Sequence, residues 1–262
     1  MPLAGPKEAL VFSAGGAFAA YQAGVWEVLS ARFQPGIVVG ASAGALNAWA
    51  VAGGAEPREL SELWLDPGCA ALAAIGGLRL PWHGLFDPAP LHARIQALWK
   101  AYRPRVEVGI VAVDLRSLRP RLFRNGEITW QHLAASCAVP LSYPPMRLDN
   151  RLYVDGGLLE ALPLWAASEM GAGRIVAIDV FDRTPSSPMR AAARLGRTLL
   201  PRPPRPPDHV EVRVMVPSRG LGPVRKAIFW DPAAVGRWIA LGRADAERGY
   251  GTARVRKRTS AF

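Results

Sequence analysis

Residues 37–47, with the sequence IVVGASAGALN, join a run of β-branched residues to a Gly-x-Ser-x-Gly turn and an alanine-rich segment. This order predicts a buried strand, a sharp turn at Ser42 and a helix, in which Gly40 and Gly44 let the strand and helix approach closely. Such a turn exposes the serine hydroxyl at a helix N-terminus, where the partial positive charge favours an oxyanion. Ser42 is therefore a candidate nucleophile; the alternative is an ordinary tight turn with a solvated serine.

Apolar runs and helical patterns alternate along much of the chain. Further strands are predicted at 10–13, 106–115, 152–155, 174–180 and 210–216. This alternation predicts an α/β fold, a three-layer α/β/α sandwich with a largely parallel central sheet. One domain is expected over residues 1–262, with a core at about 8–181, a Pro/Arg-rich insertion at 183–208, a C-terminal strand and helix at 209–250, and a basic tail at 251–262.

The formal net charge of +11 comes mostly from arginine. It indicates either an anionic partner, a membrane surface or a nucleic acid, or simply arginines spread over a solvated face. No nucleic-acid recognition motif is found, so a nucleic-acid partner is disfavoured. The basic segment 189–200 predicts a surface insertion more than an amphipathic membrane-facing helix. No signal peptide or transmembrane segment is evident, so we expect a cytoplasmic or peripheral-membrane protein.

Residues 14–24 form a second glycine-rich turn between a predicted strand and a predicted helix. Exposed backbone N–H groups in such a turn bind anions. The segment lacks the Gly-Lys-Ser/Thr of a phosphate loop and the Gly-x-Gly-x-x-Gly of a dinucleotide site. With a serine turn following closely, the amides of Gly15, Gly16 and Ala17 are candidates for an oxyanion hole.

A serine nucleophile needs a base, and two arrangements are open. The order Ser42, Asp179 and His209 would give a triad, but His209 follows a proline-rich insertion and lacks a glycine-flanked, strand-end setting. The other base is Asp155, which ends a short predicted strand and is followed by Gly156 and Gly157. These glycines let the backbone turn and leave the carboxylate uncovered, although most Asp-Gly pairs are simple turns.

Four ordered motifs together resemble the patatin-like phospholipase family of Ser–Asp acyl hydrolases. They are the glycine-rich stretch 14–24, the serine turn 40–44, the Ala-Ser-x-Ala-x-Pro segment 135–140 and the Asp-Gly-Gly motif 155–157. The resemblance covers about residues 8–181. It implies a patatin-like fold and hydrolysis of phospholipid or other acyl esters by a Ser42–Asp155 dyad, with neither metal nor cofactor. The anionic membrane surface expected as a partner comes from the net charge.

The glycine-rich stretch departs from the family pattern, Gly-Gly-Gly-x-Arg/Lys-Gly. Phe18 stands where the family has a basic residue, and Ala14 and Ala19 replace glycines. Alanine is costly wherever φ is positive. The alternative function is therefore a weakly active or inactive lipid- or membrane-binding protein, based on these three residues. Segment 67–90, rich in Gly, Pro, Trp and Leu, is interpreted as a loop packed on the core or as a mobile apolar flap.

Overall fold

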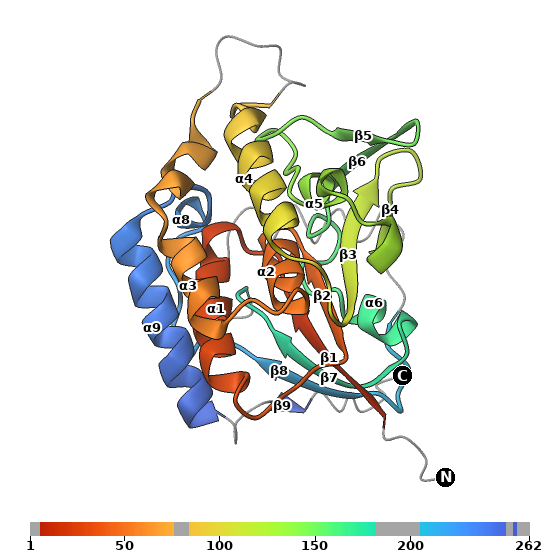
Figure 1. The fold of residues 1–262 in the computed structure, drawn as a ribbon, viewed down its shortest axis with the longest axis vertical. Coiled ribbons are helices and arrows are strands. Elements are labelled where there is room, and N and C mark those ends of the chain that lie inside the picture. Colours follow the sequence, from red (N-terminus) through yellow and green to blue (C-terminus); the bar gives the residue numbers. More distant parts are fainter. Residues whose placement is uncertain (1–5, 76–83, 182–204, 250–253, 256–262) are drawn as a thin grey trace.

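The computed structural model describes residues 6–75, 84–181, 205–249 and 254–255, and these build one mixed sheet with helices on both faces (Figure 1). The strands are β1 (Lys7–Phe12), β2 (Ile37–Ala41), β3 (Glu107–Asp114), β4 (Arg119–Arg124), β5 (Met146–Leu148), β6 (Arg151–Asp155), β7 (Ala172–Ile178), β8 (Glu211–Met215) and β9 (Arg254–Val255). The α-helices are α1 (Ala19–Leu29), α2 (Ala43–Ala52), α3 (Pro57–Leu65), α4 (Pro88–Ala101), α5 (Trp130–Ser136), α6 (Leu164–Glu169), α8 (Arg225–Ile228) and α9 (Pro232–Gly249). The 3₁₀-helices are η1 (Gly16–Phe18), η2 (Pro67–Ala73) and η4 (Asn125–Glu127). The basic segment 189–200, predicted as a surface insertion, and residues 76–83 of the segment 67–90, predicted as a packed loop or a flap, lie outside the described residues.

The centre of the sheet is parallel, as predicted. β1 pairs in parallel with β2 and β7, and the parallel order continues to β3 on one side and β8 on the other. Antiparallel strands extend both ends, because β4 and β6 pair with β3, β5 pairs with β6, and β9 pairs with β8. The short strand β9 lies in a segment that we predicted only as a basic tail. All five residues of β2 are buried, which is typical of a central parallel strand.

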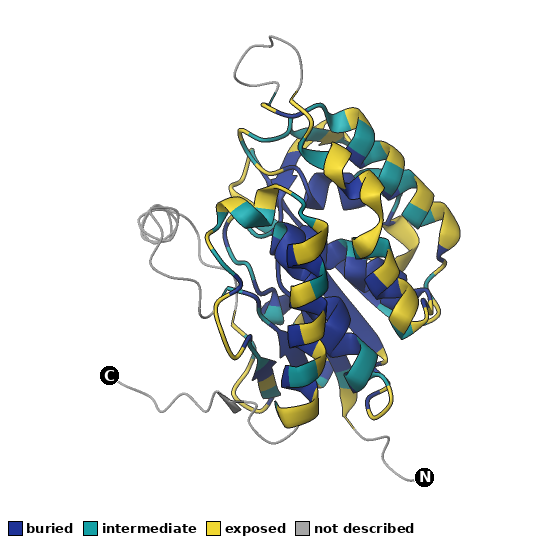
Figure 2. Ribbon diagram, turned by 90° about the vertical axis from the view of Figure 1, so that its left-hand side faces the viewer, coloured by how far each residue is buried: buried dark blue, intermediate teal, exposed yellow. Residues whose placement is uncertain are grey.

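Alternation along the central strands separates two layers of helices. On β1, Leu10 and Phe12 join the large core under α1, α2, α3 and α9, whereas Ala9 and Val11 join a smaller core under α6. Figure 2 shows this arrangement, with buried strands inside and exposed residues on the outer sides of the helices. None of the helices in the described ranges has the length and apolar composition needed to span a bilayer.

Helices α1 and α9 cross at two glycines. A Cβ at Gly24 would lie 2.0 Å from the Ile239 carbonyl oxygen, and a Cβ at Gly242 would lie 2.2 Å from the Tyr21 carbonyl oxygen. Both distances are far below a van der Waals contact, so a side chain at either position forces the helices apart. This close crossing brings α9 over the N-terminal part of α1, next to the glycine-rich loop.

We therefore expect Gly242→Ala to lower the free energy of unfolding by about 1–3 kcal/mol, because the new methyl group meets rigid backbone. Gly236→Ala is the matched control, since Gly236 is in the same helix and a Cβ placed there would have nothing within 4 Å. It should be neutral or raise stability by about 0.5–1 kcal/mol. Urea unfolding measures both, and equal effects would contradict the close crossing.

Candidate active site

Ser42 forms the turn between β2 and α2. Its φ is 54° and its ψ is −133°, a conformation that residues other than glycine rarely adopt. A Cβ at Gly40 would lie 2.2 Å from the Gly44 carbonyl oxygen, and a Cβ at Gly44 would lie 2.3 Å from the Ser13 carbonyl oxygen. Both positions therefore require glycine. The result is the strained strand–turn–helix geometry of a nucleophile elbow.

Asp155 reaches Ser42 because β2 and β6 share one edge of β3. Strand β4 covers the other edge of β3. Along the shared edge, β2 runs parallel to β3 until Ala41 lies opposite Val111, and β6 runs antiparallel until Asp155 lies opposite Ala112. The C-terminal ends of β2 and β6 thus meet at consecutive positions of β3. This meeting brings together two residues that are 113 positions apart in the sequence.

The Asp155 carboxyl group is buried, with 6% of the residue exposed. Its Oδ1 accepts a hydrogen bond from the Gly157 N–H at 2.7 Å, whereas Oδ2 has no partner within the described residues. Burial raises the pKa of Asp155 to about 6, against the opposing effects of the nearby Ser42 hydroxyl and the Gly157 amide. The hydroxyl therefore lies close to the carboxyl group, in a geometry short of a conventional hydrogen bond. Catalytic contacts of this kind often tighten only when substrate is bound.

A short segment at the end of α5 holds both residues. The Ser42 N–H donates to Ser136 Oγ at 2.9 Å, and Ser136 Oγ donates to a backbone carbonyl of β3 at 2.7 Å. The Asp155 N–H donates to the Ala138 carbonyl at 2.9 Å. Ser136 and Ala138 belong to the motif at 135–140, which is the sequence signal for these contacts, although the motif alone predicts no role for them.

The two glycines after Asp155 pack against the rest of the site. A Cβ at Gly156 would lie 2.0 Å from the Val111 carbonyl oxygen of β3. A Cβ at Gly157 would lie 2.3 Å from the Ala14 Cβ, in the loop that follows β1. The Asp-Gly-Gly turn therefore contacts both the shared strand and the glycine-rich loop.

The glycine-rich loop follows β1, so it lies at the C-terminal ends of the parallel strands, as Ser42 does. Gly16 has φ 53°, and a Cβ there would lie 2.2 Å from the Ala227 carbonyl oxygen in α8. No described residue accepts a hydrogen bond from the amides of Gly15, Gly16 or Ala17. These three N–H groups are therefore available to a ligand, as an oxyanion hole requires.

The alanines in this loop do not lie at positive φ, so the cost of alanine at such a position does not arise. Ala19 has φ −62°, and Ala14 is not among the residues with positive φ. Phe18 is fully buried, with its ring edge-to-face at 4.9 Å from the ring of Trp238 in α9. The place of the family's basic residue is thus inside the helix layer, and Phe18 offers no surface to a lipid.

A buried polar network holds the loop against the serine turn. Gln22 Nε2 donates to the Ser13 carbonyl at 2.8 Å, and Asn47 Nδ2 donates to Gln22 Oε1 at 2.9 Å. Asn47 Oδ1 in turn accepts from Trp64 Nε1 at 2.8 Å. The network joins α1, α2 and α3 behind the site, and each of these side chains is satisfied by its neighbours.

The triad Ser42, Asp179 and His209 is excluded by the sheet. Asp179 follows β7 and its carboxylate accepts from the Phe181 N–H at 2.9 Å. His209 precedes β8, which pairs in parallel with β7. Asp179 therefore lies at the C-terminal ends of these parallel strands and His209 at their N-terminal ends, so the two residues cannot belong to one triad.

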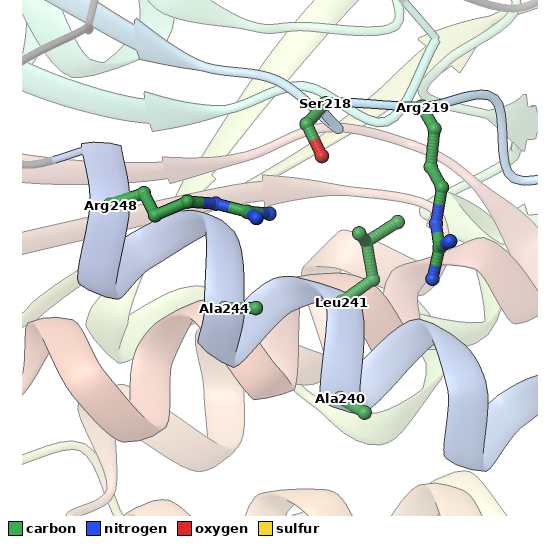
Figure 3. A pocket seen from close by; sticks show the side chains of 6 residues that line it. All are labelled: Ser218, Arg219, Ala240, Leu241, Ala244 and Arg248. Carbon is green, nitrogen blue, oxygen red and sulfur yellow. The ribbon is translucent and has the colours of Figure 1, made fainter.

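A crevice of about 330 Å³ lies away from these residues, between the loop after β8 and helix α9. It is flanked by Arg219 and Arg248 (Figure 3). Arg248 pairs at 2.8 Å with Asp245. None of the predicted site residues lines the crevice. Within the described ranges, no three His, Cys, Asp or Glu side chains form a group that could hold a metal ion.

The raised pKa of Asp155 has a consequence for stability. The fold favours the protonated form, so this contribution is complete below about pH 4 and is lost as the pH rises through about 6. Asp155→Asn cannot ionise. Its free energy of unfolding should therefore rise relative to wild type between about pH 4 and 7, by up to about 3 kcal/mol.

Urea unfolding over this pH range measures the difference. Asp149→Asn, at an exposed turn residue with φ 45°, is the control and should show no comparable gain. A difference for Asp155→Asn that stays constant with pH, or that grows as the pH falls, would contradict burial of the carboxyl group.

Curated proteins that are similar to this chain come from the family that its sequence motifs resemble. Patatin-like phospholipase domain-containing protein 7 of Rattus norvegicus is 26% identical over 192 residues, covering 69% of this chain and 14% of the relative. Patatin-like phospholipase domain-containing protein 6 of Homo sapiens is 26% identical over 194 residues, covering 68% of this chain and 14% of the relative. The chain thus spans about 14% of the length of these curated relatives.

The fold is also similar to a solved structure. The crystal structure of VipD from Legionella pneumophila matches with a TM-score of 0.54 at 12% identity, over 93% of this chain and 66% of that chain. The model of the family described as patatin-like phospholipase matches residues 10–168, a range that contains both Ser42 and Asp155. Because this match covers more than half of the sequence, the chain belongs to the patatin-like phospholipase family.

Proposed function

We propose that this chain hydrolyses lipid acyl esters, with Ser42 as the nucleophile and Asp155 as the general base. One observation carries the proposal: a strained serine turn and a buried carboxyl group, one oxygen of which has no hydrogen-bond partner among the described residues, meet at consecutive positions of β3. A serine next to a base of raised pKa is suited to nucleophilic acyl transfer. Membership of the family favours a lipid substrate, phospholipid or another acyl ester.

In the first half of the proposed reaction, the Asp155 carboxylate accepts the proton of the Ser42 hydroxyl. The Ser42 Oγ forms a bond to the acyl carbonyl carbon, and the carbonyl oxygen becomes an oxyanion. When this intermediate collapses, the ester C–O bond breaks and the alcohol leaves with the proton held by Asp155. An acyl-serine remains.

In the second half, Asp155 accepts a proton from water as the water oxygen attacks the acyl carbon. The bond to Ser42 Oγ then breaks, the oxygen recovers the proton, and the fatty acid is released. The same carboxyl group thus serves as base and then acid in each half. Its pKa of about 6 suits both tasks near neutral pH.

The amides of Gly15, Gly16 and Ala17 are the proposed oxyanion hole. They follow β1, at the same end of the parallel strands as Ser42, and no described residue accepts a hydrogen bond from them. Because Gly16 is backed by the Ala227 carbonyl, the loop cannot withdraw toward α8 without a clash. A fixed set of donors is what stabilises a developing charge most effectively.

The alternative, lipid or membrane binding with little or no turnover, keeps less support. The backbone at Ala14 and Ala19 does not have positive φ, so these alanines give no reason to expect a distorted loop. Phe18 is buried, so it cannot contact a lipid. What remains for it is the missing basic residue at position 18.

We propose a cytoplasmic or peripheral-membrane location and an anionic membrane partner, in line with the net charge of +11.

Ser42→Ala and Asp155→Asn should each reduce hydrolysis of a short-chain soluble ester by at least about 10³-fold, because each removes one half of a unit that acts together. Ser30→Ala is the matched control, because Ser30 lies beyond the far end of α1 and, among the described residues, its hydroxyl bonds the Glu27 carbonyl alone. It should keep wild-type activity. Unchanged turnover in Ser42→Ala would reject the assignment.

The kcat/KM of the wild type for a soluble ester should rise with pH through an apparent pKa of about 6 and then level off, since only the ionised Asp155 acts as base. Below that pH it should fall about tenfold per pH unit. Steady-state kinetics over the range in which the protein stays folded measures the profile. A profile that is flat through pH 6 would show that Asp155 is not the base.

A further inference from the structure

Five large apolar side chains are exposed on four described segments that contact one another. Their exposed fractions range from 45% to 80%, far above those of core residues. We call them the apolar rim: Ile75, Leu85, Leu141, Ile228 and Phe229.

The four segments are joined by direct contacts. Ile75 forms a β-bridge with Phe86, and the Leu85 N–H donates to the Leu141 carbonyl at 2.9 Å. The Phe86 ring lies edge-to-face with the Phe229 ring, at 6.2 Å between centroids. The end of η2, the start of α4, the loop after α5 and the end of α8 are therefore neighbours.

The apolar rim borders the proposed active site on two sides. Val139, itself 40% exposed, lies between Leu141 and Ala138, whose carbonyl holds the Asp155 backbone. On the other side, α8 carries Ile228 and also the Ala227 carbonyl that backs Gly16. A surface that contacts the rim therefore comes to the Ser42 side of the sheet.

Charge beside the rim favours an anionic surface. Arg225 is exposed and Lys226 is half-buried on α8, and neither forms an ion pair with a described residue. The carboxylates closest in sequence to Phe86 and Phe229, Asp87 and Asp231, accept hydrogen bonds from the first turns of α4 and α9 and so face those helix ends. The whole chain carries +11, which adds long-range attraction to an anionic bilayer.

We propose that the apolar rim and the two α8 cations dock this protein on an anionic phospholipid bilayer, with the rim inserted among the acyl chains. Apolar side chains beside unpaired cations are the combination that binds lipid interfaces. The proposal deepens the proposed function, because docking at this face would present lipid esters directly to Ser42.

Binding is tested with Ser42→Ala protein, which consumes no lipid, and vesicles of phosphatidylcholine with or without an equal amount of phosphatidylglycerol. The protein should bind the anionic vesicles more tightly. Adding Leu141→Ser and Phe229→Ser should weaken that binding by about tenfold or more. Adding Arg225→Gln and Lys226→Gln should weaken it by about fivefold per charge.

The matched charge control is Arg32→Gln with Arg58→Gln. These exposed arginines lie after α1 and in the first turn of α3, at the ends of the helices remote from the site. This pair removes the same charge and should change vesicle affinity much less than the α8 pair. Far-UV circular dichroism and unfolding midpoints confirm that each variant is folded.

Insertion is measured by site-specific labelling. Both native cysteines are buried, so an environment-sensitive fluorophore can be attached selectively to Leu141→Cys or, as the control, to Arg32→Cys. Emission should increase on anionic vesicles for the Leu141→Cys label and stay constant for the Arg32→Cys label. Equal responses at the two positions would overturn the proposal.

Absence of vesicle binding, or binding that is indifferent to the rim and to the α8 cations, would also overturn the proposal. In the second case the arginines of the crevice in Figure 3 become the expected contact. Soluble-ester hydrolysis by the wild type is measured in parallel. Hydrolysis without rim-dependent binding leaves the proposed function standing, and rim-dependent binding without hydrolysis leaves the docking surface standing.

Discussion

The site depends on one edge of β3 that two strands share from opposite directions. β2 ends opposite Val111 and β6 ends opposite Ala112, so the turns that follow them have to meet. Ser136 and Ala138 then bind the backbones of both strand ends. The positions of the serine and the carboxyl group are thus set by sheet pairing, whose many backbone hydrogen bonds make them rigid. This is the support that a pre-organised catalytic pair requires.

Burial of the Asp155 carboxyl group opposes stability at neutral pH and, in the proposed mechanism, supplies the base at the same time. The fold offers Oδ1 one amide and leaves Oδ2 without a described partner, so desolvation raises the pKa to about 6. A fully hydrogen-bonded carboxylate would be a weaker base. Behind the site, satisfied polar groups such as Gln22 and Asn47 hold the loop and the turn in place without titrating.

Local sequence patterns predicted the elements that carry the site, because the serine turn and the Asp-Gly-Gly motif are short and have strict backbone requirements. The sequence did not show that β6 joins the edge of β3 beside β2, since strand pairing over such separations has no local signal. The role of Ser136 and the contact of α8 with Gly16 were missed for the same reason. The motif comparison also left open whether Ala14 or Ala19 needs a positive φ, because backbone angles are not visible in a motif; in the structure the positive φ falls on Gly16.

The central claim is that the fold activates Ser42 as a nucleophile. It is tested most directly by incubating the folded protein with a fluorescent fluorophosphonate, which reacts with activated serines, and mapping the modified residue by mass spectrometry. The account predicts modification at Ser42, lost in Ser42→Ala and strongly slowed in Asp155→Asn. Modification at another serine, or none in protein that is shown to be folded, would contradict it.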